Sequence, residues 1–192
     1  MQLNVNYLKA AAIVTSKEEV RYYLKGVAIQ ANEKGVFIVA TDGHRALAFK
    51  QSDSYQGQPI DIIIPTEIIN SLKTKEETVE LSNGPQWSLG NIIFNPIDGT
   101  FPDWRRIAPN SISNEISQFN FSYLGDFAKV AKALGKNINP QIGHNGYGPA
   151  LITFGSDIDG FGLLMPMRTR VGDITSAPLW ASHYPETETL AA

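Results

Sequence analysis

The first side chains that could perform chemistry form a short polar run, Thr41-Asp42-Gly43-His44-Arg45, between two apolar segments. Asp-Gly is a strong signal for a β-hairpin turn, because glycine accepts positive φ and aspartate can bond its own backbone. The pattern predicts two antiparallel strands within residues 36–49 that hold His44 and Arg45 at the rim of a sheet. There they could contact a binding partner, or they could simply be solvated, as the polar tip of an ordinary hairpin is.

Catalysis by these residues is disfavoured. Asp42 and His44 lie two positions apart on a tight turn, and no nucleophile occurs in a partner motif. The three histidines, His44, His144 and His183, are too widely spaced to indicate a zinc site. The Gly-Tyr-Gly run at 146–148 lacks the third glycine and the strand–helix context of a nucleotide-binding loop. We therefore expect no enzymatic activity, no catalytic residue, no cofactor and no metal.

Lysines form the second group of interest. Within residues 124–136, apolar residues recur at helical spacing, and Lys129, Lys132 and Lys136 fall on the opposite side of that predicted helix. Two further predicted helices carry Lys9 and Lys73 in comparable positions. Such lysines could contact DNA phosphates or could merely form a solvated helix face. Because the net charge of the chain is −3, contact with DNA would require a local basic face of this kind.

The elements that position these residues follow the same order three times: a strand, a helix and further strands. The first copy comprises strand 3–7, helix 6–14, strand 22–31 and the hairpin of 36–49. The second comprises strand 60–64, a helix opened by Pro-Thr-Glu at 65–67, and strands 78–81, 86–90 and 92–95. The third comprises strand 118–122, helix 124–134, a loop at 143–149 and strands 151–154 and 161–167. We therefore predict an α+β fold of three tandem βαβββ repeats.

Composition sets the remaining bounds. The chain has 192 residues, of which 43% are hydrophobic and 18% charged, which is typical of a soluble globular protein. No segment reaches the roughly 18 consecutive apolar residues of a membrane span, and the N-terminus lacks the layout of a signal peptide. Cysteine is absent, which removes disulfides and thiolate chemistry. We expect a cytoplasmic protein without membrane contact.

Three separated segments together resemble the bacterial sliding clamp family, the DNA polymerase III beta subunit. RYYLKG at 21–26 and ATDGHR at 40–45 resemble its middle domain, DGTFPDWRRI at 98–107 resembles the connector that follows, and LLMPMR at 163–168 resembles its C-terminus. The resemblance implies the DNA clamp fold, with paired βαβββ repeats, helices lining a ring and sheets outside. It also implies the function of a processivity factor that encircles double-stranded DNA.

The resemblance further implies a groove that receives short linear motifs of the DNA polymerase and the clamp loader. The matching positions are Thr41, Gly43, His44, Arg45, Pro102, Ile107, Leu163, Met165, Pro166, Met167 and Arg168. The two methionines can repack around varied apolar anchors, although methionine is also an ordinary core filler. The basic side chains can bond a peptide backbone or acidic groups. Ala46 replaces a larger aliphatic residue of the family, which would widen the groove.

The chain departs from the family in size, because the family has six repeats and this sequence predicts three. We expect a clamp domain over residues 1–108, a half-domain over 109–170 and a C-terminal extension over 171–192. If a ring needs twelve repeats, four copies would close it, so a homotetrameric ring is favoured. The alternative is a non-ring module that captures clamp-binding peptides and competes with host replication. The small size of the chain also suggests a phage or mobile element as its source.

Overall fold

The computed structural model describes residues 1–73, 75–135 and 139–168. Its elements form three units, named here for their order along the chain. The first unit contains β1 (Gln2–Asn4), α1 (Val5–Ala12), the 3-10 turn η1 (Tyr22–Leu24), β2 (Gly26–Asn32), β3 (Gly35–Thr41) and β4 (Arg45–Ser52). The second contains β5 (Ile60–Pro65), α2 (Thr66–Asn70), β6 (Thr78–Asn83), β7 (Trp87–Leu89) and β8 (Ile92–Phe94). After the 3-10 turn η2 (Trp104–Ile107), the third contains α3 (Phe121–Ala133), β9 (Gln141–Gly143), β10 (Ala150–Thr153) and β11 (Gly160–Leu164).

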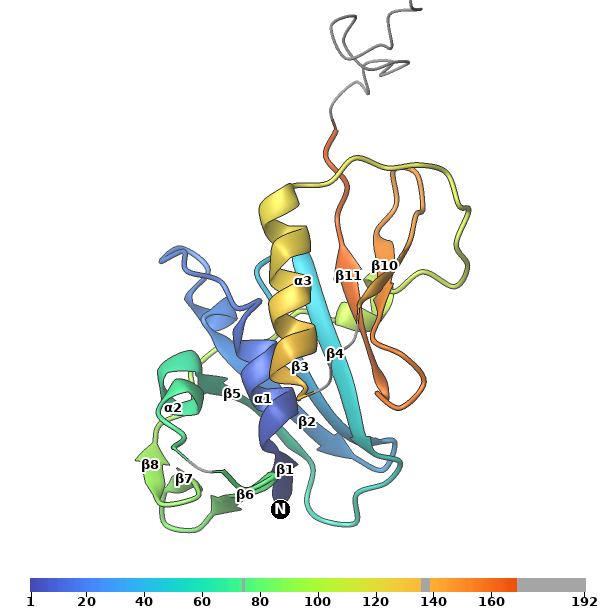
Figure 1. Ribbon diagram of the computed structural model, residues 1–192. Coiled ribbons are helices and arrows are strands. Elements are labelled where there is room, and N and C mark those ends of the chain that lie inside the picture. The colour runs from blue at the N-terminus through green and yellow to red at the C-terminus, as the bar shows by residue number, and fades with distance from the viewer. Residues whose placement is uncertain (74, 136–138, 169–192) are drawn as a thin grey trace, which may run out of the picture.

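The strands form two antiparallel sheets. One has seven strands in the order β5-β2-β3-β4-β11-β10-β9, and the other has four in the order β1-β6-β7-β8. The first two units exchange their leading strands, because β1 pairs with β6 and β5 pairs with β2. The third unit extends the large sheet through the β4–β11 pair. Helix α1 contacts both α2 and α3, and the three helices lie over one face of the strands (Figure 1).

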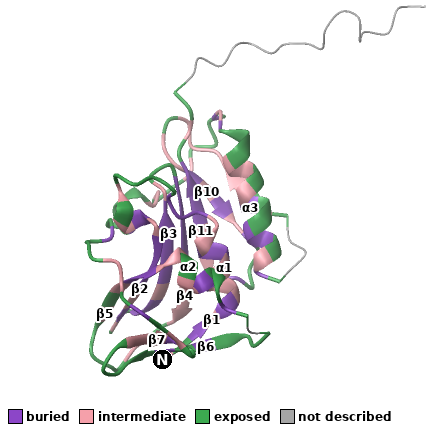
Figure 2. Cartoon of the chain, turned by 90° about the vertical axis from the view of Figure 1, so that its left-hand side faces the viewer, coloured by how far each residue is buried: buried purple, intermediate pink, exposed green. Residues whose placement is uncertain are grey.

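The main core lies between the helices and the sheets. Phe154 stands between Phe49 and Phe127, with ring centroids 6.4 Å from each, so the first and third units share one core. Strands β2 and β3 are buried along most of their length (Figure 2). A smaller apolar cluster that includes Leu24 and Trp104 covers the opposite face of the large sheet. Buried β-branched and aromatic residues on both faces therefore hold the hairpin of β3 and β4 in place.

Four predicted strands have clearly different bounds in the structure. Strand 3–7 ends at Asn4, because the Asn4 side chain caps α1, which begins at Val5. Residues 118–122 do not form a strand: the Asn120 side chain accepts a hydrogen bond from the Ser122 N–H (2.9 Å), and this cap starts α3 at Phe121. Strand 22–31 begins only at Gly26, because the preceding residues form η1. Strand 161–167 ends at Leu164, before Pro166, which has no N–H to donate to a neighbouring strand.

The strand β9 was not predicted, since the sequence there indicated only a loop from residue 143 onward. The domain division at 108–109 stays a prediction, and the large sheet crosses that boundary without a break. The expected extension over 171–192 lies outside the described residues. In the part of the chain that the structure describes, no helix is both long and apolar enough to cross a membrane.

Candidate functional site

The turn between β3 and β4 is fixed by its own side chains. The Asp42 carboxylate accepts hydrogen bonds from the backbone N–H groups of His44 (2.8 Å) and Arg45 (2.9 Å). The Thr41 hydroxyl donates to the Arg45 carbonyl (2.7 Å) and accepts from the Gly43 N–H. Gly43 has φ 89°, and a Cβ there would collide with the Arg21 guanidinium. The predicted hairpin is confirmed, and its tip has little conformational freedom.

An apolar cavity of about 290 Å³ lies beside this turn. We call it the apolar cavity; its lining residues are Arg21, Tyr23, Leu24, Thr41, Gly43, His44, Arg45, Ala46, Pro102, Asp103, Trp104, Ile107, Leu163 and Met165. The Met165 N–H donates to the His44 carbonyl (2.9 Å), which continues the β4–β11 pairing past the end of both strands. Segments that are far apart in the chain therefore converge here: η1, the hairpin tip, η2 and the end of β11.

The structure brings eight of the eleven expected groove residues to this cavity, namely Thr41, Gly43, His44, Arg45, Pro102, Ile107, Leu163 and Met165. Pro166, Met167 and Arg168 do not line it. The reason is a change of partner after Met165, because the Met167 N–H donates to the Gln118 carbonyl (2.8 Å) and not to the hairpin. The LLMPMR segment thus contributes its first half to the cavity.

Sequence reasoning did not select five of the lining residues: Arg21, Tyr23, Leu24, Asp103 and Trp104. All five lie in two of the stretches that carry the family resemblance, RYYLKG at 21–26 and DGTFPDWRRI at 98–107. Ala46, which was expected to widen the groove, also lines the cavity. Leu24 and Trp104 are at most 8% exposed. They are core residues whose outer atoms also form the cavity wall, a double role that an apolar pattern alone does not reveal.

Arg45 does not serve as the free cation that the sequence suggested. Its side chain is 8% exposed and forms ion pairs with Asp42 (3.0 Å) and Asp126. Its guanidinium also lies 4.6 Å from the centre of the Tyr123 ring, against which His44 stacks as well. Arg45 therefore ties the hairpin to α3, and its charge is compensated within the protein.

These contacts change the acidity of two groups on α3. Burial, followed by the nearby Asp42 carboxylate, raises the pKa of the Tyr123 hydroxyl. For Asp126, burial alone would raise the pKa, but hydrogen bonds from Lys129 and Arg45 outweigh it, and the pKa lies below its usual value. Asp126 is therefore charged at neutral pH and holds Arg45 in position.

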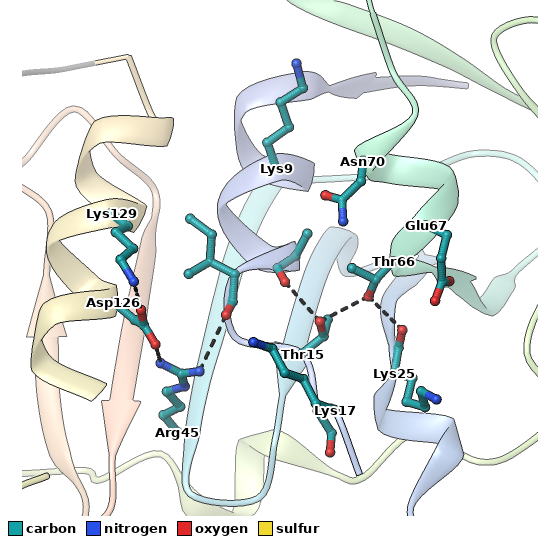
Figure 3. A pocket seen from close by; sticks show the side chains of 13 residues that line it. Lys9, Thr15, Lys17, Lys25, Arg45, Thr66, Glu67, Asn70, Asp126 and Lys129 are labelled. Carbon is teal, nitrogen blue, oxygen red and sulfur yellow. Dashed lines mark hydrogen bonds and ion pairs between the residues drawn. The ribbon is translucent and has the colours of Figure 1, made fainter. Parts of the chain in front are cut away.

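A second cavity, of about 510 Å³, lies on the helical side and is called here the lysine cleft (Figure 3). Its lining residues are Lys9, Ala12, Ile13, Thr15, Ser16, Lys17, Lys25, Arg45, Thr66, Glu67, Asn70, Asp126 and Lys129. Thr66, the first residue of α2, links three segments of the cleft wall. Its hydroxyl hydrogen-bonds to the Thr15 hydroxyl (3.0 Å) after α1 and donates to the Lys25 carbonyl (2.6 Å) before β2. Figure 3 also shows Arg45 linked through Asp126 to Lys129.

The lysines expected to face DNA do not all lie in one place. Lys9 and Lys129 line the lysine cleft, whereas Lys73 lines a separate hollow between α2 and β8. Lys132 is exposed on α3 but lines neither cavity, and Lys136 lies outside the described residues. Lys17 and Lys25 complete the cleft and were missed, because they lie in connections where helical periodicity gives no signal.

Within residues 1–73, 75–135 and 139–168, Arg45 is the one residue that lines both cavities. Its guanidinium bonds Asp126 on the cleft side, while its backbone belongs to the hairpin that walls the apolar cavity. Among the described residues, no cluster of three or more histidines and carboxylates could hold a metal ion. The arrangement combines an apolar recess for side chains with a nearby basic surface.

The sequence matches the pattern of the family described as the DNA polymerase III beta subunit, central domain, over residues 3–103. It is 29% identical over 126 residues to the beta sliding clamp of Haemophilus influenzae, covering 61% of this chain and 34% of that protein. It is 35% identical over 109 residues to the beta sliding clamp of Caulobacter vibrioides, covering 49% and 29%. The chain thus spans about a third of the length of these relatives.

Solved structures with the same fold include the DNA polymerase III beta subunit of Pseudomonas aeruginosa, with a TM-score of 0.68 at 19% identity. That likeness covers 88% of this chain and 66% of the other. The beta subunit of Borrelia burgdorferi, solved in complex with a natural product, gives a TM-score of 0.69 at 16% identity, covering 87% and 63%. The α+β clamp fold expected from the sequence is confirmed at this level.

Proposed function

This chain belongs to the DNA polymerase III beta subunit family, and we propose that it acts as a sliding clamp that holds a DNA polymerase on duplex DNA. The observation that carries the proposal is the apolar cavity, where four distant segments converge beside the rigid hairpin tip. Its wall is largely apolar and combines buried side chains such as Leu24 and Leu163 with more exposed ones at the rim, so we assign it a binding role.

We propose that the apolar cavity receives short linear motifs of a polymerase and a clamp loader. Met165 is 42% exposed at its rim and Ile107 is 46% exposed, so both offer apolar contact to an incoming side chain. The exposed His44 and the partly exposed Arg21 can bond the peptide backbone or an acidic group. A small hot spot of this kind suits weak, exchangeable partners.

We propose that DNA passes the helical side, where the lysine cleft lies. Lysine suits sliding, because its flexible ammonium group meets phosphates without reading bases. Lys129 illustrates this, since its side chain is 71% exposed although it contacts Asp126. Each phosphate neutralised should contribute about −0.9 to the slope of log affinity against log salt concentration. Long residence on DNA would then come from encirclement and not from tight binding.

We propose a homotetrameric ring, in which four copies of three units supply the circumference that the family reaches with larger chains. A non-ring module that only captures clamp-binding peptides would present the same cavity and is not favoured. The two differ in a retention assay on nicked circular DNA that is then linearised. A ring stays on the circle and slides off the linear form, whereas a non-ring module shows no such difference.

The peptide site is tested with a matched pair of variants, Met165→Glu and Met167→Glu. Both methionines are about equally exposed, but only Met165 lines the apolar cavity. The probe is a fluorescent peptide with one leucine and one phenylalanine anchor, and its alanine-substituted form measures background. Met165→Glu should weaken binding by roughly tenfold or more, which is at least about 1.4 kcal/mol, and Met167→Glu should change it little. Equal losses in both folded variants would count against this site.

A further inference from the structure

The third unit begins with the same sequence pattern as the first. Residues 1–8 read MQLNVNYL and residues 117–124 read SQFNFSYL, with Gln, Asn, Tyr and Leu in the same register. In both units the asparagine caps the helix: Asn4 accepts from the Tyr7 N–H (3.0 Å) and Asn120 accepts from the Ser122 N–H (2.9 Å). Residues 118–120 therefore correspond to the strand β1.

The first and second units show what this leading segment does when it has a partner. The N–H of Val5, the first residue of α1, donates to the Glu77 carbonyl (2.9 Å), immediately before β6. The N–H of Thr66, the first residue of α2, donates to the Lys25 carbonyl (3.2 Å), immediately before β2. The exchange is thus reciprocal, and both contacts place the helix start against the start of the other unit's strand.

The strand pairing that follows is also the same in both directions. Two residues before α1, Leu3 pairs with Val79, the second residue of β6. Two residues before α2, Ile64 pairs with Val27, the second residue of β2. An apolar pair thus occupies the equivalent position each time, and all four side chains are 8% exposed or less.

The third unit contains both halves of this exchange, but within the described residues neither half pairs as a strand with the leading segment or strand of another unit; the Gln118 carbonyl instead accepts from the Met167 N–H (2.8 Å). Residues 118–120 form no strand, and β9 pairs only with β10 at the edge of the large sheet. The linker bonds the turn after β9, through the Asn114 N–H to the His144 carbonyl (3.0 Å), and not β9 itself. An unpaired edge presents free N–H and carbonyl groups to another strand.

Exposure of the helix start supports the same conclusion. Val5 at the start of α1 is 2% exposed, whereas Phe121 at the start of α3 is 82% exposed. Ile116 and Tyr147 are 80% and 89% exposed, and the Gly146 N–H bond to the Glu115 carbonyl (2.9 Å) brings their segments together. Exposed residues also run along α3 (Figure 2). Large apolar side chains exposed in this way are typical of an interaction surface.

We propose that a second copy of this chain completes the third unit by a reciprocal exchange about a two-fold axis. Residues 118–120 of each copy pair antiparallel with β9 of the other. The spacing of the first two units gives the register: Asn120 opposite the partner's Gln141, Phe119 opposite the partner's Ile142, and the Phe121 N–H directed at the carbonyl of the partner's Pro140. Phe119 and the partner's Ile142 thereby form an apolar pair at the position that Leu3–Val79 and Ile64–Val27 occupy in the first two units.

The partner is a second copy of this chain because the same surface carries both residues 118–120 and the unpaired edge of β9, the two parts that pair with each other. Such a surface is self-complementary, which is the condition for a two-fold interface. Pairing extends the large sheet past β9 and removes its exposed edge. Phe119 keeps its place in its own core, 6% exposed and with its ring centroid 5.5 Å from that of His144, so only backbone edges are exchanged. The contact would supply part of the proposed ring, yet its test needs neither DNA nor peptide.

The first experiment measures mass in solution by sedimentation equilibrium for the full chain, Phe121→Glu and the control Val20→Glu. Val20 is 89% exposed in the connection between α1 and η1, away from the third unit. The unchanged chain and Val20→Glu should form even-numbered assemblies, and Phe121→Glu should raise the dissociation constant by roughly tenfold or more. An unchanged chain that is monomeric at about 100 μM, or equal behaviour of the two variants, overturns the proposal.

The second experiment tests the register by disulfide formation, which is clean because the chain has no cysteine. Asn120→Cys and Gln141→Cys are made on separate chains, mixed and oxidised, with Lys34→Cys replacing Asn120→Cys in the control mixture. Directly opposed antiparallel residues lie within disulfide range. A linked heterodimer should form in the first mixture alone, and its absence in a dimeric sample overturns the pairing. Retained peptide binding by Phe121→Glu would show that the proposed function does not fail with it.

Discussion

The apolar cavity and the lysine cleft share Arg45 but are built in different ways. The apolar cavity is walled by residues such as Leu24, Ala46 and Leu163, each at most 3% exposed, which the folded core holds in place. The lysine cleft is lined by long side chains that extend into solvent from helices and connections. A preformed apolar cavity binds ligands of a complementary shape, whereas mobile ammonium groups attract phosphates without requiring a defined binding geometry.

The difference fits the two tasks in the function proposed above. A peptide motif has to be recognised and later released, which requires a defined recess with few strong contacts. DNA has to be retained while the protein slides along it, which requires many weak contacts to phosphates that do not depend on the base sequence. Arg45 lines both cavities, and Asp126, with which it forms an ion pair, lines the lysine cleft. Perturbing each side separately is therefore the most direct test.

The largest effect is expected for Arg45→Ala. Removal of the guanidinium leaves Asp42 and Asp126 close together and without their main cation, so the free energy of unfolding should fall by about 3 kcal/mol. Urea unfolding measures this, with Arg106→Ala, an exposed arginine in η2, as the control. Both peptide and DNA binding should weaken in the remaining folded protein. A loss as small as that of the control would show that the shared wall does not depend on Arg45.

A large effect restricted to the cleft is expected for Lys9→Glu combined with Lys129→Glu. The double variant should be released faster from circular DNA, and the slope of log affinity against log salt should fall in magnitude by roughly 2. Lys34→Glu combined with Lys50→Glu changes the net charge equally at positions outside the cleft. Peptide binding should stay unchanged in both. If the two double variants lost DNA affinity equally, overall charge and not the cleft would explain retention.

The extension of this test to α3 uses Lys132→Glu and Lys136→Glu with Lys129→Glu. These lysines were expected on one helical face, and Lys132 is exposed there without lining the cleft. We expect impaired loading or retention on DNA and intact peptide binding, as measured with the fluorescent peptide. Parallel loss of both activities in a folded protein would argue against separate surfaces.

A moderate effect restricted to the apolar cavity is expected for Ala46→Leu. Ala46 is 3% exposed and lines the cavity opposite Leu163 in the β4–β11 register. The larger side chain would fill space that a peptide anchor otherwise occupies, so affinity for the phenylalanine-anchored peptide should fall by about 1 kcal/mol or more. A peptide with a smaller anchor serves as the comparison and should lose less. Equal losses would indicate that the anchor does not approach Ala46.

The smallest effect concerns pH. The pKa of Asp126 is lowered in the folded protein, so its contribution to stability is present above its unfolded pKa of about 3.9 and is lost as the pH falls through the folded pKa. Asp126→Asn should therefore destabilise at neutral pH, by less than Arg45→Ala does, and the difference from the unchanged chain should be smaller at about pH 3, below the unfolded pKa. Urea unfolding at both pH values measures this.

Local sequence was sufficient for several features. Asp42 and Gly43 predicted the hairpin, because their preference for the turn is a property of those residues themselves. Apolar periodicity gave α1 and α3, and the order of elements in the first two units follows the predicted one. Eight groove residues came from three segments recognised by their resemblance, although nothing in their spacing along the chain places them together.

Tertiary structure decided the features that depend on a partner. Whether residues 118–120 form a strand depends on a neighbouring edge, since backbone hydrogen bonds of a strand are made to another segment. The role of Arg45 was set by Asp126, 81 positions away in the sequence, which compensates its charge inside the fold. Lys17 and Lys25 joined the cleft only because α1 and α2 meet there. Sequence thus fixes what each residue prefers locally, and the fold selects its partners.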